Sequence, residues 1–381
     1  MRGHIRKYEG KRGTTWSVHY YLGYDQNGKK KYTTKRGFKT KKEAQTFLAG
    51  ITKDVHQGTY VDPTHDTLEQ FSARWLDYKR DFVRPRTVFI YERTLRLHVI
   101  PKLGAMKIFE LKPFHIQDLY SFLKRKQMLS NRTVSQIHNM LHDVFDRALK
   151  WEMVPRNIVE MVDAPKVTQT KFEVWSLEDV RRFLNSPEVT EHRFYIAFLL
   201  ALTTGMRQGE IMALQWNDID FENGTLEVKR TMTVDERGSV AFGPPKSESG
   251  ERVITLPSEV VEALRRHKVH QNEDRLKMSS AYHNTGLVVS RINGNHVTQA
   301  FLRAKFTKLI EQLEMPYIRF HDLRHTHTSI LLELGEDLKT LQERLGHANY
   351  QITADVYSHL SPTLKTRPAQ LLSSALFNHA K

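Results

Sequence analysis

The chain has 381 residues and is 39% hydrophobic, which is enough for two or three folded domains and excludes a wholly disordered protein. It contains no cysteine, which excludes disulfides, thiolate metal sites and a cysteine nucleophile. The formal net charge of +15 indicates a polyanionic partner, either nucleic acid or an anionic membrane, with solubility alone as the plainer alternative.

The positive charge is concentrated at the N-terminus. Residues 1–57 hold fourteen lysines and arginines against four acidic residues, so this part of the chain carries a net charge of +10. A solvated basic tail would lack a regular apolar pattern. Because these residues first alternate and then become helical in pattern, we expect a folded basic domain over residues 1–58.

This first domain is predicted to be a small β-sheet of two or three strands with one helix. Residues 15–25 alternate apolar and polar side chains, as a half-buried strand does, and residues 30–38 form the return strand. Between them lies Asn27-Gly28, a strong hairpin signal. Residues 38–55 follow with the amphipathic pattern of a helix.

A second, helical domain is predicted after a linker over residues 56–66. We expect this domain to span residues 66–166 and to be a four-helix unit. Its basic side chains could line a phosphate backbone, although for any single one of them an ordinary solvated helix surface is the favoured interpretation. The four predicted helices cover residues 67–82, 84–104, 112–126 and 131–151.

The remaining residues, 172–381, are predicted to form a mostly helical domain with one small antiparallel sheet. Ser176 is placed to cap a helix over residues 177–185. The sheet is expected within residues 224–257, where β-branched side chains alternate between glycine-containing turns. The fold class predicted for the whole chain is therefore multidomain and mainly α, with small β-sheets.

Two segments of this last domain place arginine and histidine at predicted helix starts. In "LLALTTGMRQGEIMALQW" an apolar helix runs into a glycine, and Arg207 stands where the next helix is expected to begin. In "FHDLRHTHTSILLELG", His321 and Arg324 lie three residues apart at the start of another helix. A helix N-terminus attracts anions, and an arginine there can bind two phosphate oxygens. The second helix is expected to bury its apolar body, which is Ile330, Leu331, Leu332 and Leu334.

A third segment, "LGHANYQITADVYSHL", holds His347 and, ten residues later, Tyr357. Each feature alone is a weak signal, because a single arginine often forms a surface ion pair and a single tyrosine often lies in a core. His321 and His325 have the spacing of zinc ligands, but the sequence offers no obvious third ligand. His325 and His327 are interpreted as packing or hydrogen-bonding residues.

Taken together, the segments "TTGMRQGEI", "PPKSESGERVITLP", "HDLRHT" and "LGHANYQITADVYSHL" resemble the tyrosine recombinase (phage-type integrase) family. The resemblance covers nearly the whole chain. The helical unit, with "HVIPKLG", is similar to the core-binding domain of that family, and residues 172–381 are similar to its catalytic domain. The basic N-terminal module resembles the arm-binding domain of integrases from temperate phages and integrative conjugative elements. One departure is "VPRNIV", which lacks the Asn-Pro pair common at the end of the core-binding domain.

The resemblance implies DNA strand cleavage and rejoining through a 3′-phosphotyrosine, with no metal or other cofactor. Tyr357 would be the nucleophile, and Arg207 and Arg324 would hold the negative charge that develops on the phosphate oxygens. The full set of implied catalytic residues is Arg207, Lys246, His321, Arg324, His347 and Tyr357.

The other roles follow from the need to move protons. A tyrosine has an ordinary pKa of about 10 and needs help to lose its proton at neutral pH, which His347 and His321 would give. Lys246, in a turn rich in Ser and Gly, would protonate the departing 5′-oxygen. Glu210 lies one helical turn after Arg207 and is the weakest assignment, an orienting group.

The implied activity is integration and excision of a mobile genetic element. The implied partners are double-stranded DNA, at core and arm-type sites, a homotetramer on paired sites, an excisionase and a host DNA-bending protein. No membrane partner is expected, because no apolar run is long enough to span a bilayer, and with no signal-peptide pattern the protein is expected in the cytoplasm.

Three other functions compete with this one. A type IB topoisomerase-like enzyme would use the same chemistry as a monomer, but the N-terminal module argues against it. The complete set of catalytic-type residues argues against a DNA-binding regulator that does not cleave. The lack of a carboxylate cluster argues against a metal-dependent nuclease.

Overall fold

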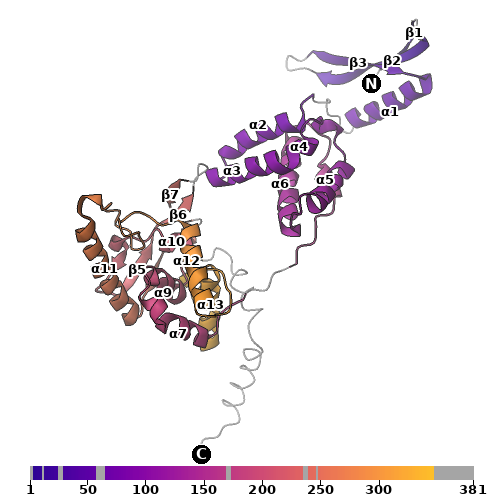
Figure 1. Cartoon of the computed structure of the whole chain (residues 1–381). Coiled ribbons are helices and arrows are strands. Elements are labelled where there is room, and N and C mark those ends of the chain that lie inside the picture. The colour runs from indigo at the N-terminus through magenta and orange to yellow at the C-terminus, as the bar shows by residue number, and fades with distance from the viewer. Residues whose placement is uncertain are drawn as a thin grey trace, which may run out of the picture. The chain divides into compact units, whose positions relative to one another are not determined.

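The computed structural model describes residues 3–10, 13–24, 29–56, 65–168, 173–234, 239–245 and 248–346 (Figure 1). The chain forms two compact units, residues 1–168 and 169–381. Helices dominate, and the sheets are small and antiparallel, so the predicted fold class is confirmed. Within the described ranges, no helix combines the length and the apolar character needed to cross a bilayer.

The N-terminal part of the first unit is a three-stranded antiparallel sheet in the order β1-β2-β3, with one helix, α1. Val18 and Tyr20 of β2 are buried against Ala44 of α1, as the predicted alternation requires. The turn at Asn27-Gly28 lies outside the described residues. The elements are β1 His4–Gly10, β2 Gly13–Tyr24, β3 Lys30–Phe38 and α1 Lys41–His56.

The four predicted helices of the next segment are present, and the second of them is interrupted. A π-helical turn, Leu95–Val99, separates its two parts. Pro101 lies in the first turn of the second part, where its lack of a backbone N–H is tolerated. Phe71 and Trp75 are fully buried among the helices. The helices are α2 Leu68–Arg80, α3 Pro85–Thr94, α4 Ile100–Leu103, α5 Pro113–Arg125 and α6 Asn131–Lys150, with short 3-10 turns at Ile108–Glu110 and Ile158–Met161.

The second unit is mostly helical. The Ser176 hydroxyl accepts a hydrogen bond from the Asp179 N–H, and the Asp179 carboxylate accepts one from the Ser176 N–H, so the predicted cap of α7 is confirmed. The helices are α7 Leu177–Asn185, α8 Pro187–Thr190, α9 Tyr195–Thr204, α10 Gln208–Ile211, α11 Ser258–Met278, α12 Gln299–Gln312, α13 Asp322–Leu334 and α14 Leu338–Leu345.

The predicted small antiparallel sheet is present, but the described residues of this unit form two separate sheets where one was expected. Between β5 and β6, Arg230 forms an ion pair with the buried Asp218 at 3.1 Å, which fixes a corner in the chain. The predicted Arg237-Gly238 turn lies outside the described residues. One sheet holds β4 Ile219–Asp220, β5 Thr225–Val228 and β8 Arg252–Thr255, and the other holds β6 Thr231–Val234 and β7 Val240–Gly243.

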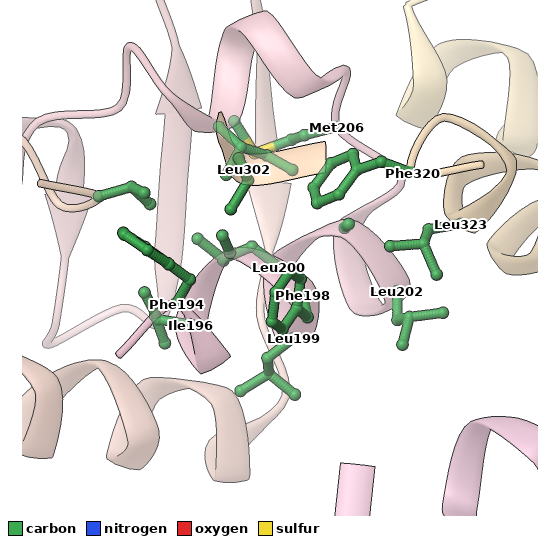
Figure 2. Packing of buried hydrophobic residues seen from close by; sticks show 14 of the residues in the cluster. Phe194, Ile196, Phe198, Leu199, Leu200, Leu202, Met206, Leu302, Phe320 and Leu323 are labelled. Carbon is green, nitrogen blue, oxygen red and sulfur yellow. The ribbon is translucent and has the colours of Figure 1, made fainter. Parts of the chain in front are cut away.

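Helix α9 lies at the centre of this unit. Figure 2 shows its side chains Phe198, Leu200 and Leu202 among others from α12, α13 and the segment before α13. The helix is apolar on all sides, which is the pattern of a core helix rather than a surface one. Its C-terminal end, which leads to Arg207, is therefore held firmly by the core.

Candidate active site

The turn between α9 and Arg207 depends on a glycine. Gly205 ends α9 with a φ of +65°, in the left-handed region that favours glycine. A Cβ at this position would lie 2.6 Å from Cδ2 of His327 and 2.6 Å from Cδ2 of Leu345. Glycine adopts this left-handed conformation without strain, so the chain can turn sharply here and place Arg207 two residues later. The close neighbours leave no room for a larger residue.

Arg207 stands at the N-cap of α10, but the expectation that a helix dipole would attract an anion there is wrong. The helix has only four residues. The Glu210 carboxylate already accepts the Arg207 N–H at 2.9 Å and the Arg207 Nη1–H at 2.8 Å. The positive group that an anion can reach at this turn is therefore the guanidinium of Arg207, whose side chain is 32% exposed, rather than the N-terminus of the helix.

Glu210 is buried between two arginines. Besides Arg207, its carboxylate accepts a hydrogen bond from Nη2 of Arg252 at 3.0 Å. Burial by itself would raise the pKa of Glu210, but the charges of Arg252 and Arg207 hold that pKa below its ordinary value. The carboxylate is thus ionised at neutral pH and is able to orient Arg207.

Arg324 lies in the first turn of α13 and is almost completely buried. Its Nη1–H donates to the Gly205 carbonyl at 2.6 Å and its Nη2–H donates to the Leu345 carbonyl at 2.7 Å. Arg207 donates to the next carbonyl, that of Gly346, at 3.1 Å. The structure therefore brings together two predicted site residues that are far apart in sequence, at the C-terminal end of α14.

Burial, followed by the positive charge of Arg207, lowers the pKa of Arg324 to about 9. The guanidinium therefore stays charged at neutral pH. An ionised arginine held by fixed carbonyl groups is preorganised to receive an anion.

His321 precedes α13 and is exposed to solvent. Protein atoms around its ring remove part of its hydration, and together with the charges of Arg324 and Arg207 they lower the pKa of His321 below its ordinary value. Its ring contacts that of His325 edge to face, with 5.4 Å between the centroids. A neutral imidazole beside two arginines is able to exchange protons at neutral pH.

The two following histidines are packing and hydrogen-bonding residues, as predicted. His327 is buried, and its Nδ1–H donates to the Leu202 carbonyl at 2.8 Å. Burial lowers the pKa of both His325 and His327 to about 4. Among the residues that the structure describes, no group of three or more histidine or acidic side chains is arranged to hold a metal ion.

Acid is expected to destabilise this unit. The pKa of His327 is about 4 in the folded chain against an ordinary 6.5, so between these values the unfolded chain binds more protons and unfolding is favoured. The stabilisation is complete above pH 6.5 and is lost as the pH falls towards 4. We expect His327→Asn, whose amide can still donate to Leu202, to reduce the loss between pH 7 and 5 by about 1–2 kcal/mol.

The measurement is urea unfolding of both proteins at pH 7 and pH 5, followed by fluorescence. Trp175, a buried side chain of the same unit, reports its unfolding. Equal pH dependence in the two proteins would show that His327 is not the group that titrates.

The prediction that α13 buries its apolar body is right for Leu332 and wrong for Leu334, and Ile330 and Leu331 are half-buried. Leu334 is 66% exposed, and of the four expected residues only Leu332 is fully buried. The helix packs on α9 through its first turns, where Thr326 and Thr328 are buried. The Thr326 hydroxyl accepts a hydrogen bond from the Trp175 N–H, and the Thr328 hydroxyl donates one to the Arg324 carbonyl. The buried side chains of α13 are therefore mainly those near its crossing with α9, rather than those of the apolar run at its C-terminal end.

Three predicted site residues, Lys246, His347 and Tyr357, lie outside the described residues. The described chain stops directly before two of these positions, at Pro245 and at Gly346. The assignment of the six catalytic residues therefore stays a prediction.

Sequence reasoning missed Arg252. Its side chain is only 7% exposed and forms an ion pair with Glu210. It stands at the start of β8, two residues before the buried Ile254, so strand alternation places both on the inward face. A charged residue on the inward face of a predicted strand was the signal that could have revealed it.

Comparison with known proteins identifies the family to which the chain belongs. The model of the phage integrase family matches residues 174–363. A tyrosine recombinase XerC-like protein of Caldanaerobacter subterraneus subsp. tengcongensis is 32% identical over 373 residues, which cover 92% of this chain and 94% of that protein. The chain belongs to the phage integrase family.

Two further family models match parts of the chain that precede this region. Residues 4–55 match an arm DNA-binding domain, and residues 67–124 match the N-terminal SAM-like domain of phage integrases. The integrase of Streptomyces ambofaciens is 29% identical, with 92% of this chain and 91% of that protein covered. The ICEBs1 integrase of Bacillus subtilis is 29% identical, with 65% and 67% covered.

Solved structures show the same fold. The Tn1549 transposon integrase in complex with transposon right end DNA has a TM-score of 0.68 at 22% identity, with 81% of this chain and 99% of that chain covered. A lambda integrase dimer bound to a COC′ core site has a TM-score of 0.59 at 15% identity, with 92% and 93% covered.

Proposed function

We propose that this member of the phage integrase family is a site-specific DNA recombinase that integrates and excises a mobile genetic element. It cuts and rejoins DNA strands through a 3′-phosphotyrosine intermediate. The observation that carries the proposal is the meeting of Arg207 and Arg324 at the carbonyls of Leu345 and Gly346, directly before His347. Two fixed cations at one place suit a single phosphate group.

Double-stranded DNA is the partner. The net charge of +15 supports it, because neutralising phosphates supplies most of the affinity of DNA-binding proteins. The match of residues 4–55 to an arm DNA-binding domain supports a second, arm-type contact in addition to the core site.

In the proposed reaction the Tyr357 hydroxyl oxygen attacks the scissile phosphorus. A phosphorus–oxygen bond to tyrosine forms as the bond to the 5′-oxygen breaks, and Lys246 gives the departing oxygen its proton. The products are a 3′-phosphotyrosine and a free 5′-hydroxyl. One phosphoester replaces another, so the reverse step joins strands without an energy source.

Arg207 and Arg324 hold the non-bridging oxygens, whose negative charge grows in the transition state. His321 and His347 donate hydrogen bonds to the phosphate and take the proton from Tyr357. Glu210 orients Arg207 through the two hydrogen bonds described above.

Three domains carry out these steps. Residues 1–58 bind arm-type DNA, residues 66–166 bind the core site, and residues 172–381 hold the catalytic residues. The separate matches of three family models support this division. The enzyme acts in the bacterial cytoplasm as a homotetramer on paired sites, with an excisionase and a host DNA-bending protein as accessory factors.

The test is covalent trapping in EDTA. The protein is incubated with a duplex from the end of its own element that carries a nick beside the crossover, and a denaturing gel separates covalent adducts from free DNA. We expect an adduct, and digestion with protease and nuclease followed by mass spectrometry should place the nucleotide on the peptide that contains Tyr357. Cleavage that needs added magnesium would overturn the proposal.

A second assay separates the competing functions. With two full attachment sites on one plasmid, a recombinase yields exchanged products, and a topoisomerase yields only relaxed circles. DNA binding with neither an adduct nor a product would support the regulator instead.

A further inference from the structure

We propose that Arg252 is a positioning residue for strand cleavage, which holds together three chain segments that lead to the predicted catalytic residues Arg207, Lys246 and His347. The inference rests on the proposed function. It assigns a role to a residue that lies outside the six predicted catalytic positions.

Each nitrogen of the Arg252 guanidinium has its own acceptor. Nε–H donates to the Arg344 carbonyl at 2.6 Å, Nη1–H to the Gly250 carbonyl at 2.9 Å, and Nη2–H to Glu210 at 3.0 Å. The three acceptors come from three different segments. A single planar group with donors in a fixed geometry therefore sets the distances between them.

Every one of these segments leads to a predicted catalytic residue. The Arg344 carbonyl belongs to the last turn of α14, three residues before His347. Gly250 ends a short turn that begins two residues after Lys246. Glu210 binds Arg207 directly. A shift of Arg252 would displace all three of these acceptors at once.

Arg252 is committed more fully to protein acceptors than Arg207 or Arg324. All three of its nitrogens are used on protein acceptors, and its side chain is 7% exposed. In the described part of the chain, Arg207 and Arg324 use only their two terminal nitrogens in this way. Of the five N–H groups of a guanidinium, these bonds leave three on Arg207 and on Arg324 and two on Arg252.

The end of α14 is the point where the three arginines meet. Three successive carbonyls, of residues 344, 345 and 346, accept hydrogen bonds from Arg252, Arg324 and Arg207 respectively. The last carbonyls of a helix have no partner within the helix, and positive charge is favourable there. Arg252 fixes the first of these carbonyls and so fixes the position of the next two.

Packing at Gly346 supports the same conclusion independently. Its φ is +65°, and a Cβ there would lie 2.5 Å from the Ser249 carbonyl and 3.2 Å from Nη1 of Arg252. The end of α14 is therefore in direct contact with the turn that contains Ser249. Arg252 bonds to both sides of this contact.

The test compares Arg252→Met and Arg252→Lys with wild type. The rate constant for adduct formation is measured in a single turnover at saturating nicked duplex, well below the melting temperature of each protein, and the dissociation constant is measured by fluorescence anisotropy. We expect Arg252→Met to lower the rate about 100-fold with a dissociation constant within about threefold of wild type, because positioning affects the reaction rather than DNA binding. Arg252→Lys should restore only part of the rate, since one ammonium cannot reach three acceptors.

Arg193→Met is the matched control. The Arg193 side chain also bonds within this unit, to the Asp274 carboxylate at 2.7 Å and to the Ser290 carbonyl at 3.3 Å, and in the described part of the chain it has no bond to α14, Glu210 or Gly250. We expect its melting temperature to fall and its cleavage rate to stay within about threefold of wild type.

A double variant tests whether Arg252 acts through Glu210. Glu210→Gln combined with Arg252→Met should cleave about as slowly as the slower single variant, because residues that act as one unit are not additive.

Three results would contradict the proposal. A wild-type rate in Arg252→Met, or an equal loss in Arg193→Met, would overturn the positioning role alone. If wild type itself formed no adduct, the proposed function and this inference would fall together.

Discussion

Replacing Tyr357 by phenylalanine is expected to abolish covalent attachment to DNA. Phenylalanine has the same ring but lacks the oxygen that forms the bond to phosphorus, so the variant lacks the proposed nucleophile. The rate of adduct formation should fall by about 10⁴-fold or more, as when other enzymes lose their nucleophile. The measurement is the EDTA gel assay with the nicked duplex, together with a mobility-shift assay showing that Tyr357→Phe still binds the same DNA.

Two other tyrosines serve as matched controls for this variant. Tyr350 lies three residues after His347 and is the nearest competitor for the nucleophile, and Tyr317 is an exposed tyrosine shortly before α13. Both Tyr350→Phe and Tyr317→Phe should form adduct at close to the wild-type rate. An adduct that disappears in Tyr350→Phe and persists in Tyr357→Phe would reassign the nucleophile.

Replacing Arg324 by lysine is expected to lower the cleavage rate about 10³-fold, the upper range seen when a charge-stabilising donor is removed from an active site. The guanidinium now bonds to the Gly205 and Leu345 carbonyls with two nitrogens at once. An ammonium keeps the charge but cannot hold both carbonyls and also bind phosphate oxygens in a planar, two-point contact.

Arg319→Lys is the control for this second variant. Arg319 also lies next to α13, but its side chain is 61% exposed and is paired with Asp322. We expect its single-turnover rate to stay within about threefold of wild type. Circular dichroism must show that Arg324→Lys is folded at the assay temperature. A folded Arg324→Lys protein that cleaves at the wild-type rate would remove Arg324 from the proposed mechanism.

The elements that the sequence predicts well are those with a strong local pattern. Residues around Val18 and Tyr20 alternate and form β2, and Ser176 with Asp179 caps α7 as its spacing indicates. Helix α9 is recognisable because it is apolar throughout. In each case the neighbouring residues in sequence contain the information.

The features that the sequence does not predict depend on packing between distant segments. Leu334 belongs to an apolar run but is exposed, because α13 crosses α9 at its other end. The start of α10, next to Arg207, was expected to attract an anion through its helix dipole. That helix has only four residues, and its third residue, Glu210, already accepts the Arg207 N–H. Strand alternation can mark Arg252 as an inward-facing charge, but its partners Glu210 and Arg344 lie in distant segments that no local pattern identifies.

The carbonyls at the end of α14 make the length of that helix a constraint. These acceptors belong to the main chain, so most substitutions in α14 leave them in place, provided that Gly346 is kept. An insertion or deletion of one residue is different, because it would rotate the helix end by about 100° and shift it by about 1.5 Å. Each arginine would then meet a different carbonyl or none. Tolerance to substitution and intolerance to a change of length should therefore coexist in the same eight residues, Leu338–Leu345.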